Sequence, residues 1–300
     1  MNLYSHQDAN IRKTWFLMSL FLVVVIFLGW FFSFLYDSRV ILYFAIIFAL
    51  GMNFFSYWYS DKIALSISGA KEIKKDEHRE LWNVVENLAI TAGLPMPKLF
   101  IIEDPAPNAF ATGRDKDHAV IAVTTGLLSI LERSELEGVI AHEFSHIGNK
   151  DILLSTIVVV LAGFIALLSD FFLRSMIWGG GGRDSRGNQL QIIMFIVGIA
   201  LAILAPIAAT LIQLAVSRKR EFLADASGAL LTRYPEGLAN ALRKISQTNQ
   251  PMKRANHATA HLFISNPFGG KGKRGFWNKI FLTHPPVEER IEALLGHNIT

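Results

Sequence analysis

The stretch VIAHEFSHIGNKD, residues 139–151, places two histidines four positions apart, with a glutamate directly after the first. Upstream, Ser134 and Glu137 have the spacing of a capping box, which predicts that a helix begins at Ser134 and carries this stretch. Residues four apart lie on one face of a helix, so His142 and His146 can offer imidazole nitrogens to one metal ion. The alternative is an exposed helix face with two incidental histidines.

Glu143 is offset by one position from the first histidine, so it points beside such an ion. From there its carboxylate can take a proton from a water molecule that the metal activates for attack on a carbonyl. This is the chemistry of the H-E-x-x-H pattern. The chain has no cysteine, which excludes thiolate ligands and thiolate nucleophiles. A third protein ligand therefore has to be a histidine or a carboxylate.

A second stretch, SRKREFLADASGALL at residues 217–231, offers such a ligand. Glu221 and Asp225 are four apart on one face of a predicted helix, so Glu221 can bind the metal while Asp225 orients an imidazole. An ordinary solvated helix face has the same spacing. The positions of these residues favour a metal site. His146 lies just before one apolar run and Glu221 lies just after the next, so two antiparallel spans would bring them to the same membrane surface.

The composition is typical of a membrane protein, because 51% of the 300 residues are apolar and 18% are charged. Crossing the apolar core of a bilayer takes roughly 20 residues in a helix. Four uncharged runs reach about that length: residues 14–36, 40–60, 152–169 and part of 187–217. A buried core helix is the alternative for each run. Only residues 37–39 separate the first two runs, which predicts a tight hairpin.

Lysine and arginine gather at the span ends that would share one side of the membrane, at residues 12–13, 62–75 and 218–220. Positive charge marks the cytoplasmic side, so both termini and the metal motif are predicted to face the cytoplasm. The second outer loop, with three arginines at residues 174–186, weakens this bias. The net charge of +4 lies beside apolar segments, so it indicates a membrane surface and no nucleic-acid partner.

These patterns divide the chain into four segments. We expect a transmembrane hairpin over residues 1–60, a first part of the polar domain over 61–151, a second transmembrane pair over 152–216 and a second polar part over 217–300. The two polar parts should pack together. Within them we expect a helix over residues 77–91, a buried strand KLFII, a hairpin formed by NAFATG and HAVIAVT, and a helical run from Thr125. The basic stretch NPFGGKGKRGF, residues 266–276, is predicted to be a loop.

AHEFSHIGNKD together with REFLADASG resembles the M48 family of zinc metalloproteases, and most closely its HtpX-type bacterial membrane members. The resemblance covers nearly the whole chain, because the apolar hairpin, PNAFATG and THPPVEERI also occur in the expected order. It implies a mostly α integral membrane protein with four transmembrane helices and a cytoplasmic α+β domain of the gluzincin type. It also implies one Zn²⁺ per chain, held by His142, His146 and Glu221.

The resemblance further implies that Glu143 is the general base and that Asp225 supports the ligands. His284 and Arg290 match a late histidine and arginine that stabilise the oxyanion. The residues HPP before a helix also fit a simple turn. Arg218 either braces the metal carboxylate or faces lipid phosphates.

The stretch NAFA matches an edge strand that lines the substrate cleft in the family; its residues are Asn108, Ala109, Phe110 and Ala111. Such a strand can take an extended peptide as an additional strand. An ordinary hairpin strand has the same appearance in the sequence.

The function expected from the resemblance is that of a zinc endopeptidase in the bacterial inner (plasma) membrane. It would be a multi-pass protein that cleaves unfolded or misfolded membrane proteins in quality control and the stress response. Its partners would be these substrates and the lipid bilayer, with a homo-oligomer or other quality-control proteases as further partners. One alternative is an M48-type prenyl-protein processing endopeptidase, whose relatives carry more spans. The other is a zinc-binding membrane holdase, which would need the metal ligands but not Glu143.

Overall fold

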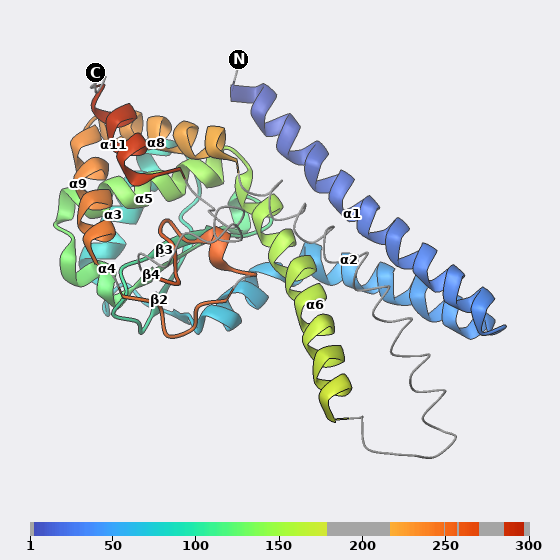
Figure 1. Cartoon of the computed structure of the whole chain (residues 1–300). Helices are drawn as coiled ribbons and strands as arrows, with labels where there is room; N and C mark the ends of the chain where they lie inside the picture. The colour runs from blue at the N-terminus through green and yellow to red at the C-terminus, as the bar shows by residue number, and fades with distance from the viewer. Residues whose placement is uncertain (1–2, 179–216, 249, 257, 270–284, 297–300) are drawn as a thin grey trace.

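Two long helices form an antiparallel hairpin that extends away from the body of the protein in the computed structural model (Figure 1). The structure describes residues 3–178, 217–248, 250–256, 258–269 and 285–296. The hairpin consists of α1 (Leu3–Leu35) and α2 (Arg39–Ser68). The two helices touch closely at Gly29, where an added Cβ would lie 2.2 Å from the Cβ of Ala45. A small residue at such a crossing is typical of helices packed in a membrane.

Among the described residues, α1 and α2 are long and apolar enough to cross a membrane. A third span results if α5 (Arg133–Gly148) and the following part of α6 (Asp151–Trp178) are counted as one segment, although they meet at 85°. The run predicted at residues 152–169 lies in α6. The fourth predicted span, up to residue 216, lies outside the described residues. The first two predicted spans are therefore confirmed as candidate membrane helices.

The body contains a four-stranded sheet in the order β1-β2-β4-β3. Its strands are β1 (Lys71–Glu72), β2 (Lys98–Ile102), β3 (Ala109–Thr112) and β4 (Val120–Thr124). Strands β2 and β4 are parallel, whereas β3 and β4 pair antiparallel. The strand KLFII and the hairpin around RDKD are thus confirmed, and β3 forms one edge of the sheet.

Helices from both polar parts of the sequence surround α5, which confirms that the two parts pack together. Helices α3 (Arg79–Ala92), α8 (Arg218–Thr232) and α9 (Pro235–Gln247) pack directly on α5. Helix α4 (Thr125–Ile130) packs on β4, and α11 (Val287–Leu295) packs on α8 and α9. Short 3₁₀ turns occupy Lys116–His118 and Ala260–Leu262. Figure 1 shows α5 between α8, α9 and the sheet. Eleven of its residues are buried, so α5 is a core helix rather than an exposed face.

The start of α5 differs from the prediction. The capping box expected at Ser134 and Glu137 is formed instead by Glu132 as the N-cap and Glu135 as the third helical residue. The carboxylate of Glu135 accepts a hydrogen bond from the backbone N–H of Glu132 at 2.8 Å. The same carboxylate accepts from Lys244 of α9 at 2.7 Å. Contact with α9 therefore favours the upstream box over the one that local spacing suggested.

Candidate metal centre

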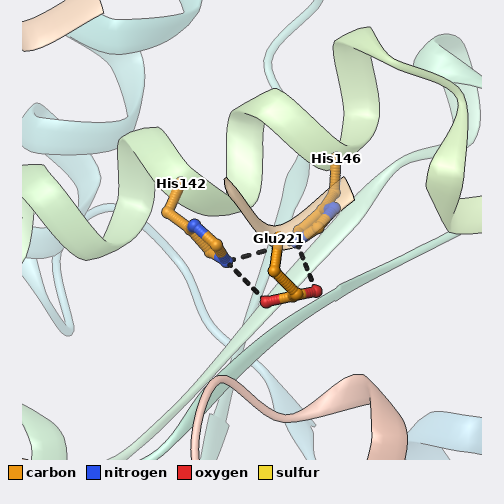
Figure 2. A group of neighbouring side chains, drawn as sticks. All are labelled: His142, His146 and Glu221. Carbon is orange, nitrogen blue, oxygen red and sulfur yellow. Dashed lines mark hydrogen bonds and ion pairs between the residues drawn. The ribbon is translucent and has the colours of Figure 1, made fainter. Parts of the chain in front are cut away.

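The two histidines and the glutamate singled out in the sequence meet where α5 crosses α8 (Figure 2). His142 and His146 lie one turn apart on α5, and Glu221 lies in the first turn of α8. Gly228 allows the two helices to approach, because a Cβ there would lie 2.9 Å from the backbone nitrogen of His142. A larger side chain at this position would push α8 away from α5.

The three side chains converge on one point. The Nε2 atoms of His142 and His146 are 3.2 Å apart, and each lies 3.7 Å from an oxygen of Glu221. Ligand atoms about 2.1 Å from a tetrahedral zinc ion are separated by about 3.4 Å, which is close to these distances. Two imidazole nitrogens and a carboxylate oxygen are also ligands that zinc prefers. The residues present therefore fit a zinc ion.

Asp225 fixes the orientation of His142. Its Oδ1 lies 2.8 Å from His142 Nδ1, and Arg290 donates to both of its oxygens at 2.8 and 2.7 Å. Burial on its own would raise the pKa of Asp225, but the hydrogen bonds and charge of Arg290 hold it below its ordinary value. The charged carboxylate accepts a hydrogen bond from the Nδ1–H group of His142. The lone pair of His142 Nε2 then faces the other two proposed ligands.

Asp151 plays the same part for His146. This buried carboxylate, at the start of α6, lies 3.0 Å from His146 Nδ1. Burial would lower the pKa of His146, but the hydrogen bond to Asp151 and the charge of Glu221 raise it to about 9. This role of Asp151 was not predicted from the sequence. Its signal was an aspartate five positions after His146, at the start of the next helix.

Glu143 is buried beside the two histidines and faces β3. Burial raises the pKa of its carboxyl group above the ordinary value, although both histidines and a hydrogen bond from the backbone of Ala111 oppose this change. A carboxylate with a raised pKa accepts a proton from water more readily than an exposed one does.

The edge of β3 is partly covered by the chain itself. The backbone N–H of Ile264 donates to the carbonyl oxygen of Ala109 at 3.0 Å, and the side-chain amide of Asn108 bonds to the backbone of Ser265 in both directions. Phe110 is fully buried against Phe263, with ring centroids 5.1 Å apart. Of the stretch NAFA, the end at Ala111 is therefore the part that faces the candidate site.

The structure describes only one of the two residues near the C-terminus that were predicted to stabilise the oxyanion. Arg290 is fully buried and contacts the histidine cluster through Asp225, with its Nη2 3.4 Å from His142 Nδ1. His284 lies outside the described residues. Arg218 is exposed at the start of α8, whereas Arg220, which the sequence indicated only as a charge at a span end, is buried. The oxyanion roles of His284 and Arg290 stay predictions.

Residues 75–298 match the sequence model of peptidase family M48. The chain belongs to this family. An M48 relative, a protease HtpX homolog of Caldanaerobacter subterraneus subsp. tengcongensis, is 48% identical over 97% of both chains. A protease HtpX homolog of Tropheryma whipplei (strain Twist) is 52% identical over 84% of both chains. The resemblance seen in the motifs is thereby confirmed, and this M48 protein is a membrane-bound metalloprotease.

The fold of this M48 protease also resembles the crystal structure of Ste24p from S. mikatae, with a TM-score of 0.51 and 20% identity. The alignment covers 94% of this chain and 66% of that one, so the chain spans about two thirds of its length. At this level of identity the similarity supports the shared fold alone.

Proposed function

We propose that this M48 protease is an endopeptidase that uses one zinc ion per chain, held by His142, His146 and Glu221. The observation that carries the proposal is the meeting of three ligand atoms within 4.8 Å, combined with the hydrogen bonds that hold both histidines. Asp225 and Asp151 each occupy the Nδ1 side of one imidazole, so both Nε2 atoms face Glu221. Such an arrangement is typical of a metal site that is preorganised for its ion.

When bound, zinc supplies Lewis acidity toward a water molecule and the scissile carbonyl. Glu143 would act as the general base, since it lies next to the ligands and its raised pKa favours accepting a proton. The same carboxyl group would then deliver that proton to the leaving amine. We propose that His284 stabilises the oxyanion, and that Arg290 contributes by holding Asp225 charged and in place.

We propose that the substrates are unfolded or misfolded membrane proteins. An extended chain can pair with the end of β3 at Ala111, whose backbone is within hydrogen-bonding reach of Glu143. A folded protein offers few such free segments. The site also lies close to membrane helices, because α6 begins three residues after α5 ends. The Lys and Arg pattern supports a bacterial inner membrane protein whose site faces the cytoplasm.

The test is proteolysis of an unfolded membrane substrate by the detergent-purified full chain. Glu143→Gln should retain one zinc ion per chain and lose turnover by about 10²- to 10⁴-fold, because it removes the general base but no ligand. His142→Ala should lose most of the zinc. Normal turnover by Glu143→Gln would contradict the mechanism and favour the non-catalytic holdase.

A further inference from the structure

The first membrane helix reaches the metal site through polar side chains. Gln7 of α1 donates to the carbonyl oxygen of Gly148 at 2.8 Å. One turn along, the amide nitrogen of Asn10 lies 2.6 Å from Asp151 Oδ1 and 3.2 Å from the carbonyl oxygen of Asn149. These groups form the turn between α5 and α6. Asn10 is only 3% exposed, and burying an amide is costly unless its polar groups are paired.

The Asn10 side chain lies between two residues that neighbour proposed metal ligands: Asp151, which contacts His146, and Arg220, which precedes Glu221. Asp151 uses its other oxygen, Oδ2, to hold His146 Nδ1. On the opposite side, Arg220 donates from Nη1 to the Asn10 Oδ1 at 3.3 Å and lies 3.8 Å from Asp151 Oδ1. Arg220 immediately precedes Glu221 in the first turn of α8. Asn10 therefore connects the residue that orients His146 to the helical turn that carries Glu221.

An asparagine side chain suits this place because it donates and accepts at once. Its NH₂ group faces a carboxylate, and its oxygen faces a guanidinium. The turn that it holds also includes Lys150 in the left-handed region, with φ of 57°. A non-glycine residue in that conformation needs its surroundings to hold it.

We propose that Asn10 is a positioning residue of the metal site, so that the N-terminal membrane helix helps to set the geometry of His146 and Glu221. The inference rests on the proposed zinc site. Apolar contacts keep α1 in place beside it, since Leu17 and Phe21 of α1 pack on Leu154 and Ile157 of α6. Loss of the Asn10 amide should thus change the positions of His146 and Glu221 more than the packing of α1 on α6.

Zinc affinity of the detergent-purified full chain, measured by competition with a chelator, tests the proposal. Asn10→Ala should weaken zinc binding by about 10- to 100-fold, as expected for an outer partner of a ligand. Asn10→Asp keeps the size and shape but faces Asp151 with a second carboxylate, so it should weaken binding as well. The matched control is Asn53→Ala, which removes a 3.1 Å hydrogen bond from α2 to the Met18 carbonyl of α1 and touches no metal partner. It should leave the affinity unchanged.

A double variant shows whether Asn10 acts through Asp151. If it does, Asn10→Ala combined with Asp151→Ala should bind zinc no more weakly than Asp151→Ala alone. Wild-type affinity in both Asn10 variants, or an equal loss in Asn53→Ala, would overturn the inference and leave the zinc site standing. Retention of zinc by His142→Ala would instead refute the proposed site itself, and the role of Asn10 would fall with it.

Discussion

Arg290 is a fully buried arginine whose guanidinium donates to both oxygens of Asp225. Arg290→Ala should lower the free energy of unfolding by about 3–5 kcal/mol, because the buried carboxylate would lose its partner. It should also weaken zinc binding, since Asp225 orients His142. Denaturant unfolding in detergent and chelator competition measure the two effects.

The control for this variant is Arg133→Ala, which removes a surface ion pair with Glu137 at 3.3 Å and should change stability by less than about 1 kcal/mol. If Arg290→Ala lost turnover with unchanged stability and zinc affinity, Arg290 would act on the oxyanion and not through Asp225.

The pKa of His146 predicts how zinc binding depends on pH. In the metal-free protein, Asp151 and Glu221 raise this pKa from 6.5 to about 9 against the effect of burial, so the imidazole is protonated at neutral pH. Zinc needs the neutral form and must displace that proton. The affinity should therefore rise by about tenfold per pH unit from about pH 7 and level off above about pH 9. Calorimetry in buffers of different ionisation enthalpy would detect the released proton. Affinity that stays flat over this range would contradict the prediction.

The proposed metal ligands could be predicted from the sequence because the spacing within each helix is local. His142 and His146 share a helix face by their separation of four residues, and so do Glu221 and Asp225. The contacts that hold the proposed ligands from outside, such as the one between Asn10 and Asp151, could not be predicted in this way. Asn10 and Asp151 are 141 residues apart, and only the packing of α1 against the α5–α6 turn brings them together. Asn10 lies in the polar stretch SHQDANIRK before the apolar run, so its local sequence does not distinguish it from its neighbours.

The crossing of α5 and α8 depends on Gly228. Alanine is about 1 kcal/mol better than glycine in a helix interior, so Gly228→Ala should stabilise an isolated α8. In the folded protein its Cβ would meet the backbone of His142 at 2.9 Å, and α8 would have to move. We expect weaker zinc binding and a net loss of stability of about 1–3 kcal/mol. Gly51→Ala in α2, where an added Cβ meets nothing within 4 Å, is the control. Wild-type zinc affinity in Gly228→Ala would show that the crossing tolerates the extra methyl group.

Elements with a strong local pattern were predicted well. Leu81, Val84, Val85 and Leu88 line the buried face of α3 as their spacing indicated, and the turn RDKD joins β3 and β4. The predicted capping residue of α5, Ser134, lies two residues after the observed N-cap, Glu132. An ion pair between Glu135 and the partly exposed Lys244, on a helix that follows much later in the chain, favours the capping box that forms. The segment around Ile264, which covers the edge of β3, was not predicted for the same kind of reason. Ile264 reaches Ala109 only in the folded chain.

At the scale of the whole molecule, the membrane hairpin packs against the part of the protease domain that carries the proposed site. Helix α1 contacts the α5–α6 turn, while the end of α2 packs with Phe110 of β3 through Ala64 and Leu65. Both helices of the hairpin thus touch elements that carry proposed site residues. The proposed role of Asn10 predicts that a chain without residues 1–60 binds zinc less tightly than the full chain when both are measured by chelator competition.

The orientation of the hairpin in the membrane follows from its charges and can be tested directly. Positive residues at 12–13, near the start of α1, and after residue 60 predict that the turn between α1 and α2 faces away from the cytoplasm, whereas the domain faces it. The chain has no cysteine, so single cysteines can be introduced without a background. In right-side-out vesicles, Ser38→Cys in the turn should react with a membrane-impermeant maleimide. Asp76→Cys, at an exposed position before α3, should react only after the membrane is opened. Ser38 makes no side-chain cap hydrogen bond, so the substitution removes no contact from the helix start. The reverse labelling pattern would place catalysis outside the cytoplasm and overturn the topology.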